Sequence, residues 1–231
     1  MMLQLKQLSI GHQPNVPLTN AITAGFSAGG LHVILGVNGS GKTTLLRSVL
    51  GVQAPLGGSI SIQKKDGSTI SVGSNEWKSH IAYVPSTPPR QVGLTVREVL
   101  ALSGSPDKAT KRHSRLSEWL DSPLMSLSDG QAQQVMCARA MLQSSGWLAL
   151  DEPTAFLDVR GQRDLWEMLS EHIRGGGSIL MSTHDLRGVC RWIEGASNAF
   201  KQSSSLNLLA KDGLQPLDLD LPETSLEAKL M

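Results

Sequence analysis

The glycine-rich run at residues 36–44, with the sequence GVNGSGKTT, constrains the fold of this chain more than any other feature. It follows a compact apolar run at 31–35, which predicts a buried strand, and it opens a helix-period segment from 42 to about 51. Glycines let such a loop curl so that successive backbone N–H groups and the helix N-terminus point at a phosphate. We therefore expect an α/β fold with a phosphate site at a strand-to-helix turn.

The chemistry of phosphate binding accounts for the residue types in this run. Lys42 supplies a positive charge for the phosphates, and Thr43 supplies a hydroxyl that suits magnesium. By itself the pattern indicates only a nucleoside triphosphate, and an ordinary glycine-rich turn is the alternative. The residues expected to hold the nucleotide in this run are Gly36, Asn38, Gly39, Ser40, Gly41, Lys42, Thr43 and Thr44.

Two later apolar runs end in polar side chains that complete such a site. The run at 147–150 ends in Asp151 and Glu152, where Asp151 is placed to hold magnesium and Glu152 to polarise an attacking water as general base. The run at 178–181 leads to His184, which could hydrogen-bond a γ-phosphate oxygen. A helix cap or turn is the alternative for the two acids, and a structural role is the alternative for the histidine.

The segment 127–131, with the sequence LSDGQ, predicts a helix start. Ser128 and Gln131 have the spacing of a capping box, and Gly130 leaves the backbone amides open to an anion. The segment also resembles the signature of the ABC transporter ATPases, and it precedes Asp151 in the order found in that family. The runs at 36–44, 151–158 and 182–186 match further motifs of the same family.

The resemblance implies a P-loop NTPase fold of the ABC type. Its expected parts are a mostly parallel sheet core, an N-terminal antiparallel β subdomain and a short inserted helical subdomain. It also implies that ATP with Mg2+ lies between two copies of the chain in a head-to-tail dimer. Ser128, Gly130 and Gln131 of one copy would face the ATP held by the other, Asp158 would lie at the seam, and the catalytic residues would be Lys42, Glu152 and His184.

Two positions depart from the pattern of the family. His12 stands where most members stack an aromatic residue on adenine; imidazole offers less surface for stacking, and a solvated turn is the alternative. Ser86 stands where most members carry a Gln that reaches magnesium and links the core to the helical part. Serine is shorter, so a magnesium contact from Ser86 needs a bridging water or a shifted loop.

The helix and strand patterns divide a single domain, 1–231, into parts. We expect the core at 1–85 and 127–200, a helical insertion at 86–126, and a C-terminal extension at 201–231 that contains a short strand pair. The insertion is shorter than is usual in the family. Within the insertion we expect helices at 95–102 and 111–120. A further helix is expected at 161–173, after the strand that ends in Asp151 and Glu152.

Composition narrows the partners and the setting. A net charge of +1 with 18% charged residues argues against a nucleic-acid surface. The chain contains no apolar run near the roughly 20 residues that span a bilayer. Its two cysteines, Cys137 and Cys190, suit a reducing compartment. Together with the resemblance, these features imply a cytoplasmic subunit that is peripheral on the cytoplasmic face of the inner (plasma) membrane.

Details of the motifs narrow the resemblance within the family. The runs 94–99, 150–158 and 182–186, together with Ser86 and Asp129, resemble the ATPases of bacterial importers for iron-siderophore, haem or cobalamin. This implies transmembrane permease subunits as partners and, indirectly, a periplasmic or lipoprotein substrate-binding protein. The alternatives are the ATPase of an ABC exporter and a soluble ABC ATPase without a transport role. Soluble members usually carry two ATPase halves or a long coiled coil.

Overall fold

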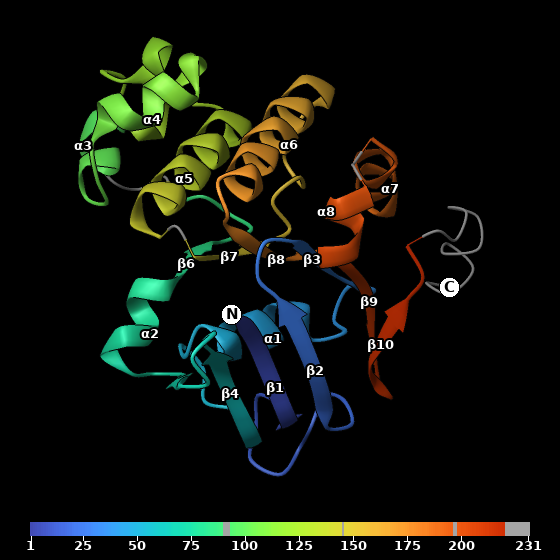
Figure 1. Ribbon diagram of the computed structural model, residues 1–231. Helices are drawn as coiled ribbons and strands as arrows, with labels where there is room; N and C mark the ends of the chain where they lie inside the picture. Colours follow the sequence, from blue (N-terminus) through green and yellow to red (C-terminus); the bar gives the residue numbers. More distant parts are fainter. Residues whose placement is uncertain (90–92, 145, 196–197, 220–231) are drawn as a thin grey trace.

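Two sheets form the framework of the structure, a computed structural model that describes residues 1–89, 93–144, 146–195 and 198–219 (Figure 1). One sheet has four antiparallel strands in the order β2-β1-β4-β5, and the other has six strands in the order β10-β9-β3-β8-β7-β6. The strands of the first sheet are β1 (Met2–Ser9), β2 (Ile22–Ser27), β4 (Gly57–Gln63) and β5 (Thr69–Ser71). The strands of the second are β3 (Leu31–Leu35), β6 (Ile81–Val84), β7 (Trp147–Asp151), β8 (Ser178–Thr183), β9 (Ser205–Ala210) and β10 (Gly213–Leu217).

The six-stranded sheet is parallel except for β10, which runs antiparallel to β9. Every residue of β3, β7 and β8 is buried, because layers of structure cover both faces of the sheet. The parallel core and the N-terminal antiparallel part predicted from the sequence are therefore confirmed.

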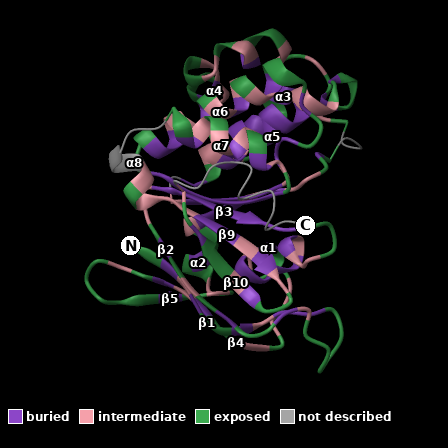
Figure 2. Cartoon of the chain, turned by 90° about the vertical axis from the view of Figure 1, so that its right-hand side faces the viewer, coloured by how far each residue is buried: buried purple, intermediate pink, exposed green. Residues whose placement is uncertain are grey.

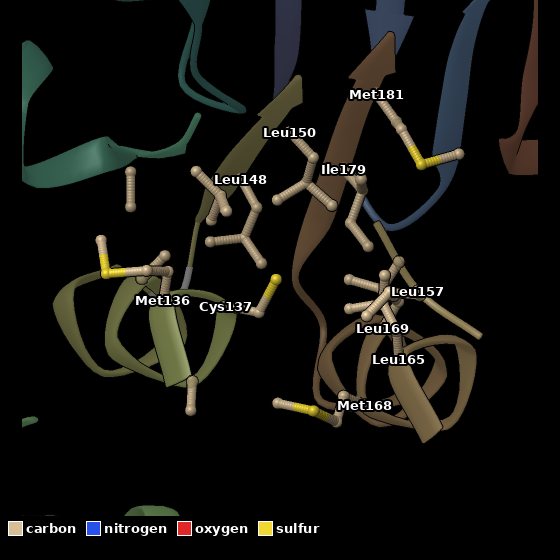
Figure 3. Close-up of a cluster of buried hydrophobic side chains, with 14 of the residues drawn as sticks. Met136, Cys137, Leu148, Leu150, Leu157, Leu165, Met168, Leu169, Ile179 and Met181 are labelled. Carbon is tan, nitrogen blue, oxygen red and sulfur yellow. The ribbon is translucent and has the colours of Figure 1, made fainter. Parts of the chain in front are cut away.

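Helices cover the two faces of the six-stranded sheet separately. The helices on one face are α5 (Asp129–Gln143), α6 (Val159–Arg174) and α7 (Leu186–Glu194), while α1 (Lys42–Val49) lies on the other face, toward the antiparallel sheet (Figure 1). Figure 3 shows Cys137 of α5 and Leu165 of α6 facing Leu148 and Ile179 of the sheet. In Figure 2 the buried residues gather in the strands and on the inner sides of these helices. Cys137 is buried in this layer.

A small helical lobe follows β6, as the sequence predicts, but its second half is different. The lobe contains α3 (Val96–Ala101), α4 (Pro106–Arg112), η1 (Ser114–Trp119) and η2 (Leu124–Ser126), where η marks a 3₁₀ helix. The sequence predicts one helix at 111–120, and this prediction is wrong, because the segment is divided between α4 and η1. Pro106 starts α4 early, at a position where its missing N–H costs nothing, and the non-helical backbone of His113 ends it. The short helix α2 (Asn75–His80), before β6, was not predicted.

The C-terminal segment expected as an extension contributes to the core sheet instead. The strand pair is β9 and β10, and β9 lies parallel to β3, with Ser205 opposite His32. The buried imidazole of His32 hydrogen-bonds the Ser205 hydroxyl at 2.9 Å and the Ser27 carbonyl at 2.7 Å, which ties this strand to the sheet. Helix α8 (Asn198–Ser203) precedes β9, and residues 220–231 lie outside the described residues. None of the described helices combines the length and apolar character needed to cross a membrane.

Candidate functional site

The glycine-rich loop joins β3 to α1 and takes a backbone path that needs glycine. Gly39 and Gly41 have φ values of +83° and +100°, in the left-handed region. A Cβ on Gly36 would lie 2.5 Å from the Ser40 hydroxyl and 2.9 Å from the Leu209 carbonyl oxygen. Gly41 is the N-cap of α1 and no side chain caps the first turn, so its amides can bind an anion.

The ammonium of Lys42 lies among three oxygen atoms. It donates hydrogen bonds to the carbonyl oxygens of Gly36 at 2.7 Å and Val37 at 3.2 Å, and it forms an ion pair with Glu152 Oε1 at 3.3 Å. Only 6% of the side chain is exposed. Burial of this cation beside one carboxylate makes a strong local field directly under the loop.

Asp151, at the end of β7, is held by hydroxyl groups. Its Oδ1 accepts hydrogen bonds from Ser182 Oγ at 2.5 Å and from Thr43 Oγ1 at 3.2 Å, and the residue is 1% exposed. Tyr83 of β6 lies beside the same carboxylate; burial raises the pKa of its phenol to about 12, and the charge of Asp151 adds to the rise. No motif in the sequence points to a role for Ser182 or Tyr83, although the register of β7 and β8 sets Ser182 opposite Asp151.

Glu152 follows Asp151 in a backbone conformation that is uncommon for a side chain with a Cβ. Its φ is +46°, and such outliers gather at functional sites. The carboxylate accepts a hydrogen bond from the His184 backbone N–H at 3.1 Å and contacts His184 Nδ1 at 2.8 Å. The structure therefore brings Lys42, Glu152 and His184, the three expected catalytic residues, into one cluster with Thr43 and Asp151.

The oxygen atoms of this cluster fit a magnesium ion bound together with phosphates. Among the described residues no group of three or more His, Cys, Asp or Glu side chains forms a metal cage. Magnesium is usually held by one or two carboxylates and the substrate's phosphates, with waters in the remaining positions. The carboxylate of Asp151 and the hydroxyl of Thr43, which lie next to the phosphate loop, are donors of that kind.

The two positions that depart from the family pattern, His12 and Ser86, lie in the segments that follow β1 and β6. The exposed His12 is next to α1, with Nε2 3.3 Å from Thr44 Oγ1. Ser86 follows β6 and is half-buried. Beside it, the Gln133 side chain of α5 donates a hydrogen bond to the Pro85 carbonyl at 3.1 Å and so connects this loop to the signature helix. No motif in the sequence singles out Gln133, so this link could not be predicted.

The signature segment begins α5 with the capping box that its sequence predicts. Ser128 Oγ accepts a hydrogen bond from the Gln131 N–H at 3.2 Å, and the Gln131 side chain accepts one from the Ser128 N–H at 2.9 Å. A Cβ on Gly130 would lie 2.9 Å from Leu157, so glycine lets the segment after Glu152 pack closely. Asp158 caps α6 by accepting a hydrogen bond from the Gly161 N–H at 2.7 Å.

A pocket of about 490 Å³ opens between the signature segment and the loop after β7. Ser128, Gly130, Gln131 and Asp158 line it, while none of the described residues at 36–44 does. The helices that follow these two segments, α5 and α1, lie on opposite faces of the six-stranded sheet (Figure 1). The two expected halves of the nucleotide site are therefore not assembled within one chain.

The fold and the cluster define a class of protein: an ATPase of the P-loop type, with a phosphate loop and an acidic strand at the carboxyl edge of a parallel sheet. Residues 19–155 match the family model described as ABC transporter. The chain therefore belongs to the ABC transporter family, in which it is an ATP-binding domain that hydrolyses ATP to power transport.

Individual relatives agree with this assignment. The zinc import ATP-binding protein ZnuC of Pseudomonas fluorescens is 33% identical over 186 residues, which are 80% of this chain and 68% of the relative. The iron(3+)-hydroxamate import ATP-binding protein FhuC of Bacillus subtilis is 27% identical over 82% of this chain and 76% of the relative. A solved ATP-binding subunit of an ABC transporter superposes with a TM-score of 0.79 at 26% identity, covering 100% of this chain and 99% of that one.

Proposed function

We propose that this chain is the ATPase subunit of an importer for a metal ion or a metal chelate. The similar proteins named for zinc import and for iron(3+)-hydroxamate import support the cargo class. The motif details that resemble importers of iron-siderophore, haem or cobalamin point to the same class. A likeness to a bacterial exporter at 18% identity supports the fold alone. An ATPase subunit does not bind the cargo. Its residues therefore support the hydrolytic step and do not identify the cargo.

The observation that carries the hydrolytic role is the position of Glu152 between Lys42 and His184. In this proposal Lys42 and the loop amides bind the phosphates, and ATP replaces the contact between Lys42 and Glu152. Glu152 then accepts the proton of the attacking water, and His184, which Glu152 holds in place, hydrogen-bonds a γ-phosphate oxygen. His12, beside the first turn of α1, would stack on the adenine.

Thr43 and Asp151 would hold magnesium, with Ser86 reaching it through water. When bound, magnesium neutralises charge on the phosphate oxygens. The protein's share is to present the Asp151 carboxylate in one orientation beside the phosphate loop, which the hydroxyls of Ser182 and Thr43 do.

A head-to-tail dimer would complete the site. Ser128, Gly130 and Gln131 of one copy would bind the ATP held by residues 36–44 of the other, and Asp158 would lie at the seam. The separation of the two halves within one chain supports this arrangement, and so do Phe156 and Val159, which are 51% and 81% exposed beside the pocket. Permease subunits, a substrate-binding protein and a place on the cytoplasmic face of the membrane follow from the importer role.

Glu152→Gln tests the hydrolytic role, because glutamine keeps the shape of the side chain but cannot accept the proton. We expect kcat to fall by roughly 100- to 10,000-fold while ATP binding persists and ATP-bound dimers accumulate. ATPase assays and light scattering after gel filtration measure the two effects. Glu194→Gln, an exposed acid on α7, serves as the matched control. Turnover at the parent rate in Glu152→Gln would remove Glu152 from the role of base.

Uptake tests the cargo class separately. Cells without the gene should accumulate less radiolabelled zinc or less radiolabelled iron supplied as a ferric hydroxamate. The parent chain should restore uptake and the Glu152→Gln chain should not. Normal uptake of both cargoes in cells whose missing chain is an active ATPase would refute a metal importer while leaving the ATPase assignment intact.

A further inference from the structure

Ser182 contacts both acidic residues of the proposed hydrolysis site. Its side chain is fully buried, and its hydroxyl lies 2.5 Å from Asp151 Oδ1. Its backbone carbonyl accepts a hydrogen bond from the Glu152 N–H at 2.9 Å, and its hydroxyl lies 3.4 Å from the same N–H. One residue of β8 therefore fixes two consecutive residues of the neighbouring strand end.

The direction of these hydrogen bonds follows from the donors present. Asp151 as a carboxylate can only accept, so the one hydroxyl proton of Ser182 goes to Asp151. The lone pairs of the same hydroxyl then face the Glu152 N–H. The carboxylate and the amide are thus linked through a single oxygen atom that water does not reach.

The position of Ser182 in the sheet explains why this contact is rigid. Asp151 and Ser182 are directly opposite each other in the parallel pairing of β7 and β8, and both strands are buried throughout. Immediately after this pair the chain turns at Glu152, where φ is +46°. A left-handed residue persists only where its surroundings hold it, and the hydrogen bond from its N–H to Ser182 is one of the contacts that does so.

The contacts of Thr43 and Ser182 with Asp151 differ in one respect. Thr43 belongs to the phosphate loop, and its hydroxyl is itself a donor for magnesium, so its 3.2 Å contact with Asp151 can be exchanged when magnesium-ATP binds. Ser182 belongs to the sheet, and the other contact of its hydroxyl is with the Glu152 N–H at the neighbouring strand end. The phenol of Tyr83, on β6, also hydrogen-bonds Asp151. Ser182 can therefore keep Asp151 oriented throughout the binding of magnesium-ATP.

We propose that Ser182 is a positioning residue for the reaction. Its hydroxyl orients the Asp151 carboxylate toward magnesium, and its backbone carbonyl holds Glu152 next to the attacking water. The inference rests on the proposed function of Asp151 and Glu152. It has a consequence that a purely structural role lacks. Loss of the hydroxyl weakens the contribution of magnesium to nucleotide binding and leaves nucleotide binding without magnesium unchanged.

Ser182→Ala removes the hydroxyl and keeps the backbone carbonyl. The experiment measures the affinity of the full chain for the non-hydrolysable analogue AMPPNP by calorimetry, once with Mg2+ and once with EDTA. We expect Ser182→Ala to weaken binding by about 10- to 100-fold in Mg2+, the usual cost of losing a partner of a metal-binding carboxylate, with no change in EDTA. The concentration of Mg2+ that gives half-maximal ATPase activity should rise as well.

Two variants serve as controls. Ser178→Ala removes another buried hydroxyl of β8, one that accepts a hydrogen bond from the Gly29 N–H at 2.8 Å at the far end of the strand, and should leave the magnesium response unchanged. Ser182→Thr keeps the hydroxyl, and threonine suits a strand, so it should recover most of the magnesium response. Thermal melts followed by circular dichroism show that each variant is folded.

The outcomes separate this inference from the proposed function. A folded Ser182→Ala chain with the magnesium response of the parent would refute the positioning role, and so would an equal loss of affinity in Mg2+ and in EDTA. Either result leaves the ATPase assignment standing as long as the parent binds AMPPNP and hydrolyses ATP. A parent chain that does neither would refute both.

Discussion

In the proposed site, nucleotide binding depends most directly on Lys42. Its ammonium is enclosed by Gly36, Val37 and Glu152, so the charge is delivered to the inner side of the phosphate loop and not to bulk water. We expect Lys42→Ala to weaken ATP binding by roughly 100-fold or more, because charge-assisted hydrogen bonds to phosphate are lost. Calorimetry with ATP measures this. Lys108→Ala, on the exposed side of α4, is the control, and equal affinity in both variants would contradict the assignment of the loop.

Buried histidines give the protein a pH-dependent stability. Burial lowers the pKa of His32 to about 4, against about 6.5 in an unfolded chain. Between these values the unfolded state binds the extra proton, so stability is intact above pH 6.5, falls as the pH drops toward 4, and is constant below. The effect of His32 is on the order of 3 kcal/mol. Burial lowers the pKa of His113 and His172 to about 4 as well, so both add to the same trend.

Urea denaturation at pH 7.5 and pH 5 measures this loss of stability. His32→Gln keeps a hydrogen-bonding side chain without a titrating group, and we expect its free energy of unfolding to depend less on pH than that of the parent. His80→Gln, at the partly exposed end of α2, should retain the pH dependence of the parent. A parent chain equally stable at both pH values would contradict the prediction.

Roles that depend on contacts between residues close in the chain could be predicted from the sequence. The capping box of Ser128 and Gln131 could be read from spacing alone, and the structure confirms it. The two acids could be placed at a strand end because the apolar run before them stops there. Ser182 could not be identified, because its partner lies 31 positions earlier and the contact exists only in one strand register.

Among the elements, the helical lobe shows how contacts with the core override a helical pattern. The pattern at 111–120 favours one helix, yet the structure breaks it at His113, and the ion pair of Arg115 with Asp164 then joins η1 to α6. His113 Nδ1 also lies 3.6 Å from Glu171 of α6. The distance along the sequence gives no sign that Asp164 or Glu171 contacts the lobe. The same holds for β9, whose parallel partner β3 precedes it by some 170 residues.

Arg115→Ala tests the contact between the lobe and α6. We expect a small loss of global stability, about 1 kcal/mol, because the pair is partly exposed. Hydrogen exchange in α4 and η1 should speed up, since these elements lose an anchor to the core. Arg97→Ala removes the exposed pair with Asp121 inside the lobe and is the matched control. Equal exchange rates at 106–119 in both variants would show that the Arg115 pair does not anchor the lobe.

At the scale of the whole molecule, the separation of the two half-sites makes two copies the expected working unit. Lys42 and Glu152 lie in one cluster, while Ser128 and Asp158 line a pocket that none of the described residues at 36–44 reaches. In a head-to-tail dimer each site would combine the cluster of one copy with the pocket of the other, as the symmetry of a closed pair requires. This pairing can be tested with mixtures of inactive chains.

Lys42→Ala and Ser128→Arg should each abolish ATPase activity alone, since one lacks the phosphate charge and the other blocks the pocket. When mixed, the mixed dimers contain one site in which both residues are intact, so activity should return to about a quarter of the parent value. A mixture of Lys42→Ala with Glu152→Gln should stay inactive, because both changes lie in the same cluster and every site has lost one residue. Recovery in the second mixture, or none in the first when both variants are folded and form mixed dimers, would refute the head-to-tail arrangement.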